Sequence, residues 1–180
     1  MANRSLFNSI FAATFVFMMA PEAATAEDTM HFAAKLSTAQ ELPAPAPGLI
    51  ERAVVKADFD LELGSVRVHL VVRDGSHVVA AHFHCALPGE NGPVAFGLFS
   101  PGPLAFGGVQ ARGTLTNENF TGTDCVPNIG RPVNTIAALA FAMREGLIYA
   151  NVHTTDNPPG EVRGQMLQVE GAVETIDPMQ

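Results

Sequence analysis

In "ADFDLELGSVRVHLVVRDG", residues 57–75, apolar side chains occupy every second position. They are Ala57, Phe59, Leu61 and Leu63 in the first half and Val66, Val68, Leu70 and Val72 in the second, and mostly charged residues stand between them. A period of two is typical of a strand with one buried and one solvated face, because successive side chains point to opposite faces. The pattern therefore predicts a β-hairpin that turns at Gly64-Ser65, followed by another turn at Asp74-Gly75.

Short strand-like segments bounded by Gly and Pro continue along the rest of the chain. They predict strands at residues 30–37, 78–85, 94–99, 109–115, 147–153 and 162–169. Only "NTIAALAFAMREG", residues 134–146, favours a helix, because it is rich in alanine, has Asn134 or Thr135 as a cap and ends at Gly146. We therefore expect an all-β fold, an antiparallel β-sandwich or barrel-like Greek-key fold with one short helix.

The first 26 residues have the pattern of a secretory signal peptide. Arg4 gives a basic start, residues 6–20 are mostly apolar, and "ATA" ends at Ala26, where we expect cleavage. The apolar run is too short and interrupted to favour a membrane span, although an uncleaved anchor is the alternative. We therefore expect residues 27–180 to form a single β domain that is secreted or periplasmic, without a membrane span in the mature chain.

Charge and cysteine content restrict the partners. The formal net charge is −8 and the chain has no basic run, which argues against binding to nucleic acid or anionic lipid. In an oxidising compartment, the two cysteines, Cys85 and Cys125, predict one disulfide. The alternative is that Cys85, beside His84, acts as a soft metal ligand.

The candidate chemistry lies in "VVAAHFHCALPGENGPV", residues 78–94. On a strand, His82 and His84 point to the same face. His153, at the end of "LIYANVH", is the best third partner, and three neutral imidazoles suit a metal ion. The competing hypothesis is that these histidines are solvated or structural.

Two further polar residues follow the tight turn "NPPG", residues 157–160. Glu161 and Arg163 share a face of the last strand segment. Such a pair ordinarily satisfies loop backbone or each other. The functional alternative is that both residues lie beside the histidines and orient them as metal ligands through hydrogen bonds.

Three segments together resemble the CHRD, or chordin, domain. They are "FAAKLSTAQELPAP" at 32–45, "AAHFHCALPGENGPV" at 80–94 and "YANVHTTDNPPGEVRGQM" at 149–166. The resemblance spans almost all of the chain that follows the signal-like segment. It implies either an exported single-domain protein of the microbial type or a module like those of animal chordin, which bind growth factors of the bone-morphogenetic type. The chain has one copy and no cysteine-rich modules beside it.

The histidine motifs also look like the copper-binding parts of copper–zinc superoxide dismutases. By this likeness, His82, His84 and His153 correspond to copper ligands and Arg163 to the arginine near the metal. The sequence has no histidine to bridge to zinc and no His/His/Asp zinc set between the motifs, and "GENGPV" is too short for the long metal-binding loop. The likeness therefore implies a mononuclear copper site at most.

The sequence thus supports two main hypotheses. The first is an exported metal-binding protein, a copper carrier, buffer or sensor that uses His82, His84 and His153. The second is an extracellular protein-interaction module with structural histidines, which includes self-association through exposed strand edges. An enzyme ranks last, because the sequence contains no G-x-S-x-G elbow, H-E-x-x-H helix or phosphate-binding glycine loop.

Overall fold

The computed structural model describes residues 29–48, 50, 52–73, 77–100, 102–108, 110–120 and 125–171. The expected signal peptide and the Asp74-Gly75 turn lie outside these residues. The strands are β1 (Thr29–Ser37), β2 (Arg52–Asp60), β3 (Ser65–Val72), β4 (Val78–Cys85), β5 (Val94–Phe99), β6 (Gln110–Thr116), β7 (Ile148–Thr154), β8 (Val162–Gln165) and β9 (Leu167–Gln168). The helices are α1 (Val126–Ile129) and α2 (Ile136–Arg144), with single 3₁₀ turns at Thr38–Gln40 and Asn117–Asn119.

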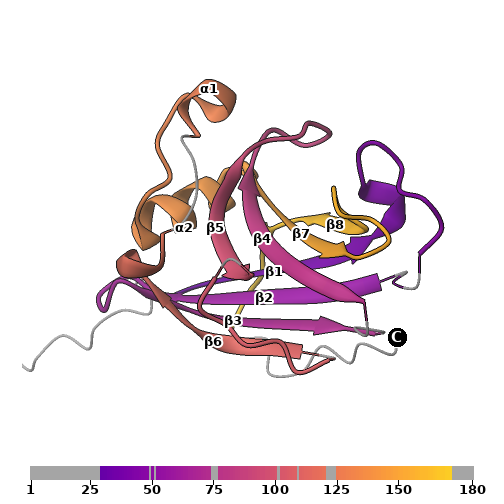
Figure 1. Ribbon diagram of the computed structural model, residues 1–180. Coiled ribbons are helices and arrows are strands. Elements are labelled where there is room, and N and C mark those ends of the chain that lie inside the picture. Colours follow the sequence, from indigo (N-terminus) through magenta and orange to yellow (C-terminus); the bar gives the residue numbers. More distant parts are fainter. Residues whose placement is uncertain are drawn as a thin grey trace, which may run out of the picture.

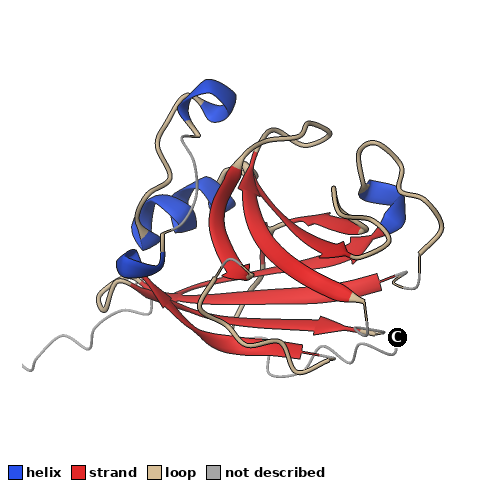
Figure 2. Cartoon of the chain, in the orientation of Figure 1, coloured by secondary structure: helices blue, strands red, loops and turns tan. Residues whose placement is uncertain are grey.

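The strands form one antiparallel sheet in the order β5-β4-β7-β8-β1-β2-β3-β6, and β9 adds to β1. The sheet curls strongly, so that β4, β5 and β7 cross over the layer formed by β1, β2, β3 and β6 (Figure 1). The helices lie at the margins of this strand body (Figure 2). The structure therefore confirms the predicted all-β, barrel-like architecture.

The hairpin predicted from residues 57–75 forms between β2 and β3, with Ala57 opposite Val68 and Asp60 opposite Ser65. The prediction was wrong at its turn: the strand ends at Asp60, and Leu61 and Leu63 belong to the connection, where Leu61 is partly buried against the core. The carboxylate of Asp60 accepts a hydrogen bond from the Leu63 backbone at 2.9 Å, which closes the turn early. Leu63 is consequently 75 % exposed.

The core fills the space between the two halves of the curled sheet. Its largest fully buried side chains include Phe32, Phe59, Phe83, Phe96, Leu70 and Leu115. Phe32 and Phe59 meet edge to face at 5.5 Å between ring centroids, a favoured aromatic geometry. Helix α2 adds Ile136, Leu139 and Met143 to the same core.

The predicted helix is present in a shorter form, Ile136–Arg144. Of the two candidate caps, Thr135 is the one used, and its side chain accepts a hydrogen bond from the Ala138 backbone at 3.1 Å. Gly146 follows the helix with φ +71°, a conformation that glycine adopts without steric cost. The four-residue α1 was not predicted. No described helix is both long and apolar enough to cross a membrane.

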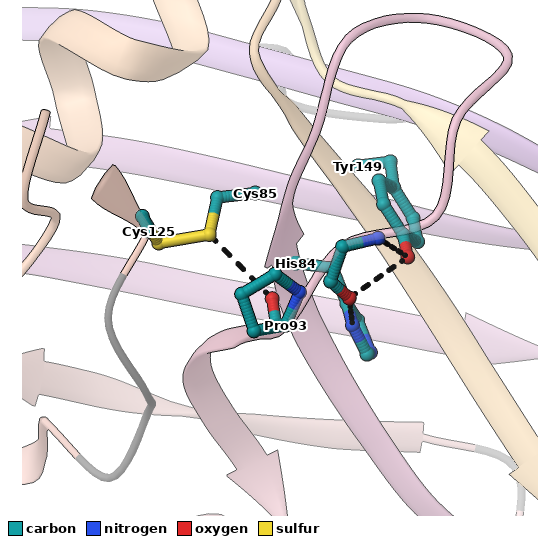
Figure 3. The surroundings of a disulfide bond; sticks show 6 residues. His84, Cys85, Pro93, Cys125 and Tyr149 are labelled. Atoms are coloured by element: carbon teal, nitrogen blue, oxygen red, sulfur yellow. Dashed lines mark hydrogen bonds between the residues drawn. A yellow bond between two sulfur atoms is a disulfide. The ribbon is translucent and has the colours of Figure 1, made fainter. Parts of the chain in front are cut away.

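The two cysteines form a disulfide, which confirms that prediction and excludes Cys85 as a metal ligand. Cys85 and His84 leave β4 in opposite directions (Figure 3). The sulfur of Cys85 turns toward Cys125, directly before α1, whereas the ring of His84 lies on the side of Tyr149. One strand thus carries the covalent cross-link on one face and the histidines on the other.

Replacing both cysteines with alanine is expected to lower the free energy of unfolding by about 3–4 kcal/mol. The disulfide closes a loop with a sequence separation of 40 residues and restricts the unfolded chain. Urea denaturation followed by circular dichroism measures the change. Reduction of the unmodified protein should reproduce it, and equal denaturation midpoints for the oxidised, reduced and doubly substituted proteins would contradict the expectation.

Candidate metal centre

Neighbouring strands bring three histidines to one face of the sheet. His82 and His84 lie on β4, and His153 lies near the end of β7. In the antiparallel register, Ala80 is opposite His153 and His82 is opposite Asn151, so His82 and His153 are diagonal neighbours. One nitrogen from each of the three rings lies within 4.8 Å of the others. The structure therefore brings together all three residues proposed as ligands.

Backbone carbonyls determine which nitrogen of two rings faces inward. His84 donates from Nδ1 to the Gly92 carbonyl, and His153 donates from Nδ1 to the Pro158 carbonyl, both at 2.9 Å. In a neutral ring this leaves Nε2 with a free lone pair. Nε2 of His84 is buried and, within the described chain, has no hydrogen-bond partner. Outer hydrogen bonds of this kind are typical of histidines that bind metals.

His82 completes the donor set through Nδ1, which lies 3.0 Å from Nε2 of His153. Since Nε2 of His153 is the acceptor, His82 donates this hydrogen bond, and its proton has to move or leave before Nδ1 can bind a metal. Two metal–nitrogen bonds of about 2.0 Å that meet at 90–110° place their nitrogens about 2.8–3.3 Å apart. The spacing between His82 and His153 is therefore already that of two ligands on one ion.

All three imidazoles favour the neutral form that metal binding requires. Burial lowers the pKa of His82 to about 3, and the nearby His153 and His84 rings contribute, while a backbone interaction with Ser100 acts in the opposite direction. Burial lowers the pKa of His84 to about 4 despite its bond to Gly92, and burial also lowers the pKa of His153. The three residues are 8–9 % exposed, so they lie just beneath the surface.

Tyr149 forms the wall of the centre beside His84. Its ring stacks on His84 at 4.9 Å between centroids and 11° between planes. Its hydroxyl accepts a hydrogen bond from the Gly92 backbone at 3.2 Å and lies 3.4 Å from the Gly92 carbonyl (Figure 3). Gly92 is tightly confined, because a Cβ there would lie 1.9 Å from the Cys85 carbonyl. Tyr149 thus positions both the His84 ring and the carbonyl that orients it.

Arg163 supports the same side of the centre without reaching the imidazoles. Its guanidinium lies 3.5 Å from the centre of the Tyr149 ring, a cation–π contact. It also donates to the Glu90 carbonyl at 2.6 Å and to the Asn91 side chain at 2.8 Å. These bonds anchor the loop that ends in Gly92. Arg163 therefore acts on His84 through Tyr149 and through this loop.

Glu161 supports the His153 side in a similar way. It is almost fully buried and accepts hydrogen bonds from the backbone of Ile50 and from the side chains of Thr154 and Asn157. Thr154 and Asn157 belong to the segment that carries Pro158, whose carbonyl binds His153. Glu161 and Arg163 do not pair with each other. Each holds a loop that supplies one carbonyl to one histidine.

Several residues of the centre were not predicted. Tyr149 shares the face of His153 by the period of two along β7, a signal that could have identified it. The carbonyls of Gly92 and Pro158 leave no sequence signal, because every residue carries one. The other described histidines lie elsewhere: His31 bonds Asp58, His69 bonds Gln110 and His77 bonds Asp156.

Comparison with known families identifies the domain. The profile of the CHRD domain matches residues 32–166, three quarters of the chain. The chain belongs to the CHRD domain family. No curated protein and no solved structure shows significant similarity to it. The matched CHRD segment begins in β1 and ends just after β8, and it includes His82, His84, His153, Glu161 and Arg163.

The CHRD assignment and the disulfide together indicate an extracellular or periplasmic protein. CHRD membership indicates an extracellular module. The cluster of His82, His84 and His153 lies within the matched segment.

Acidification should destabilise the metal-free protein between about pH 6.5 and pH 4. In that window the unfolded histidines take up protons, whereas burial keeps His82 and His84 neutral in the folded protein, so the unfolded state gains stability. Each such histidine contributes a slope of about 1.4 kcal/mol per pH unit. Urea denaturation at several pH values, in the presence of a chelator, measures the slope of the free energy of unfolding against pH. His84→Gln should lower the slope of unfolding free energy against pH by the share of one histidine.

Glu161→Gln is expected to lower the free energy of unfolding by about 1–3 kcal/mol. The substitution keeps the shape but replaces one acceptor oxygen with an NH₂ group, while the backbone of Ile50 and the amide of Asn157 both present donors. Thermal and urea unfolding of the metal-free variant measure the loss. A stability equal to that of the unmodified protein would show that these bonds do not hold the two loops.

Proposed function

We propose that this CHRD protein binds a single copper ion through His82, His84 and His153 and acts outside the cytoplasm as a copper carrier, buffer or sensor. One observation carries the proposal: three neutral imidazoles converge, and two of them are oriented by carbonyl acceptors on their outer nitrogens. The donor set is Nδ1 of His82 and Nε2 of the other two. A bound ion would satisfy Nε2 of His84, which is otherwise buried without a partner among the described residues.

Copper is favoured by the donors. Imidazole nitrogens suit copper and zinc, and among divalent first-row ions Cu²⁺ has the highest intrinsic affinity for such a site. The nearby Cys85 sulfur is bonded to Cys125 and is not available as a thiolate ligand. The site therefore has nitrogen donors only. No fourth Asp, Glu, His or Cys belongs to the cluster in the described part of the chain. A ligand from solvent or from another molecule would complete the coordination.

The position of the centre supports binding and release rather than permanent burial. The three histidines lie on one face of the β4–β7 pair, and each keeps a small exposed area. An ion could reach them without unfolding of the sheet. The farthest nitrogens are at most 4.8 Å apart, so the ligands would need to close by no more than about 1–1.5 Å around an ion with bonds of about 2.0 Å.

The second hypothesis, an extracellular protein-interaction module with structural histidines, is consistent with the family. In that case the His82–His153 hydrogen bond would serve packing alone. The unsatisfied Nε2 of His84 favours the metal site, because a purely structural histidine would be expected to use both ring nitrogens.

Titration of chelator-stripped, untagged protein with Cu²⁺ is expected to show one ion per chain. Alanine at His82, His84 or His153 should weaken binding by at least about 100-fold, since loss of an outer partner alone costs about 10–100-fold. Calorimetry with a competing chelator measures affinity, and electron paramagnetic resonance detects the nitrogen ligands. His77→Ala, which removes a more exposed histidine that contacts Asp156 instead of the cluster, is the matched control.

The proposal fails if copper binds with unchanged affinity to the three alanine variants, or if their affinity falls no further than that of His77→Ala. Each variant must keep its disulfide and its near-ultraviolet circular dichroism, so that a loss of copper is not a loss of fold. Parallel titration with Zn²⁺ should give weaker binding.

A further inference from the structure

A small pocket lies next to the histidine centre, between the proline-rich loop that begins at Glu41 and the turn that ends at Gly160. Its volume is about 150 Å³. Most of its wall is apolar and comes from prolines and alanines of residues 42–46 together with Pro159. Glu41 contributes the only ionisable side chain of the described lining. The pocket shares no residue with the three histidines.

Two buried oxygens near this pocket lack hydrogen-bond partners among the described residues: Oε2 of Glu41, which lines the pocket, and Oδ1 of Asn151, which lies beside Gly160. The side chains are 5 % and 3 % exposed. Both oxygens face Gly160, which lines the pocket, since a Cβ on that glycine would lie 2.7 Å from each of them. The same Cβ would lie 2.6 Å from Asn151 Nδ2, so only glycine fits where Glu41 and Asn151 converge on the wall of the pocket.

The surrounding protein meets the hydrogen-bonding capacity of this carboxylate only in part, although the Asn151 amide lies beside it. Oε1 of Glu41 accepts from the Leu42 backbone at 3.0 Å, but the amide of Asn157 is already committed to Ala46 and Glu161. The charge of Arg163 and the Asn151 amide stabilise the carboxylate, yet Arg163 makes no ion pair with it in the described structure. Burial consequently raises the pKa of Glu41. A buried carboxylate oxygen without a hydrogen-bond partner is costly unless a ligand satisfies it.

We propose that this pocket binds a primary ammonium group on a short aliphatic chain, which donates hydrogen bonds to Glu41 Oε2 and Asn151 Oδ1 while its methylenes lie against the prolines. An ammonium group offers three donors and a positive charge. Two free oxygens are too few for Ca²⁺, which takes six to eight oxygen ligands. The net charge of −8 favours a cation. The proposal goes beyond the copper site and does not rest on it.

The group can come from a lysine side chain of another protein or from a free alkylamine. The test uses the full chain with its disulfide intact and with a chelator present, so that no amine can bind through copper. n-Butylammonium is titrated at neutral pH and followed by nuclear magnetic resonance. Saturable shifts are expected around Glu41, Asn151 and Gly160. n-Butanol, which lacks the charge, and tetramethylammonium, which lacks N–H donors, should bind at least about tenfold more weakly.

Two variants separate ligand recognition from folding. Glu41→Gln removes the charge and should weaken n-butylammonium binding at least about tenfold. Ala44→Leu, on an exposed part of the loop, narrows the pocket without changing the carboxylate. It should also weaken n-butylammonium binding. If thermal unfolding shows that Glu41→Gln does not fold, the n-butylammonium affinity of Ala44→Leu alone tests the proposal. Absence of saturable binding, or unchanged affinity in the folded variants, overturns the proposal.

A capped Gly-Lys-Gly peptide and its norleucine counterpart identify the source of the ammonium group. Binding of the lysine peptide more tightly than n-butylammonium assigns the pocket to a lysine of a protein partner. Equal or weaker binding of the peptide assigns it to a free alkylamine. Equal binding of the norleucine peptide would contradict recognition of the ammonium group and overturn the proposal.

Discussion

The antiparallel pairing of β4 with β7 is the constraint on which the histidine centre depends. In this register His84 is opposite Tyr149 and His82 is opposite Asn151, so the rings of both strands gather on one face. A slip by one residue would turn an entire strand's side chains to the other face. It would move His82 and His84 away from His153 and bring Phe83 and Cys85 in their place. The same register serves the core, the disulfide and the centre.

Around this face, the buried Arg163 and Glu161 side chains support loops and do not pair with each other. Arg163 holds the loop that ends in Gly92, and Glu161 holds the segment that carries Pro158. Burying an ionised group is unfavourable unless hydrogen bonds replace its hydration. Both residues meet that condition through backbone and side-chain partners, and the loops thereby gain defined positions. The carbonyl groups that orient His84 and His153 are the result.

The two faces of β4 have different chemistry, and the alternation of a strand keeps them apart. Cys85 points toward Cys125 and α1, while its neighbour His84 points toward Tyr149 (Figure 3). The disulfide therefore stabilises the strand that carries two of the histidines and keeps sulfur out of the centre. For an extracellular or periplasmic CHRD protein, this arrangement leaves a site with imidazole donors that an oxidising environment does not disturb.

The sequence alone determined the all-β class, because the period of two over residues 57–75 can bury one face only in a sheet. It also placed His82 and His84 on one face and identified Cys85 and Cys125 as a pair. It did not place the turn after Asp60, because the alternation continues through Leu63 while the Asp60 carboxylate closes the turn earlier. Only the tertiary structure decided that His153 meets His82, and that Gly92 and Pro158 orient the rings. These contacts join residues distant in the chain and use backbone carbonyls, which no residue type reveals.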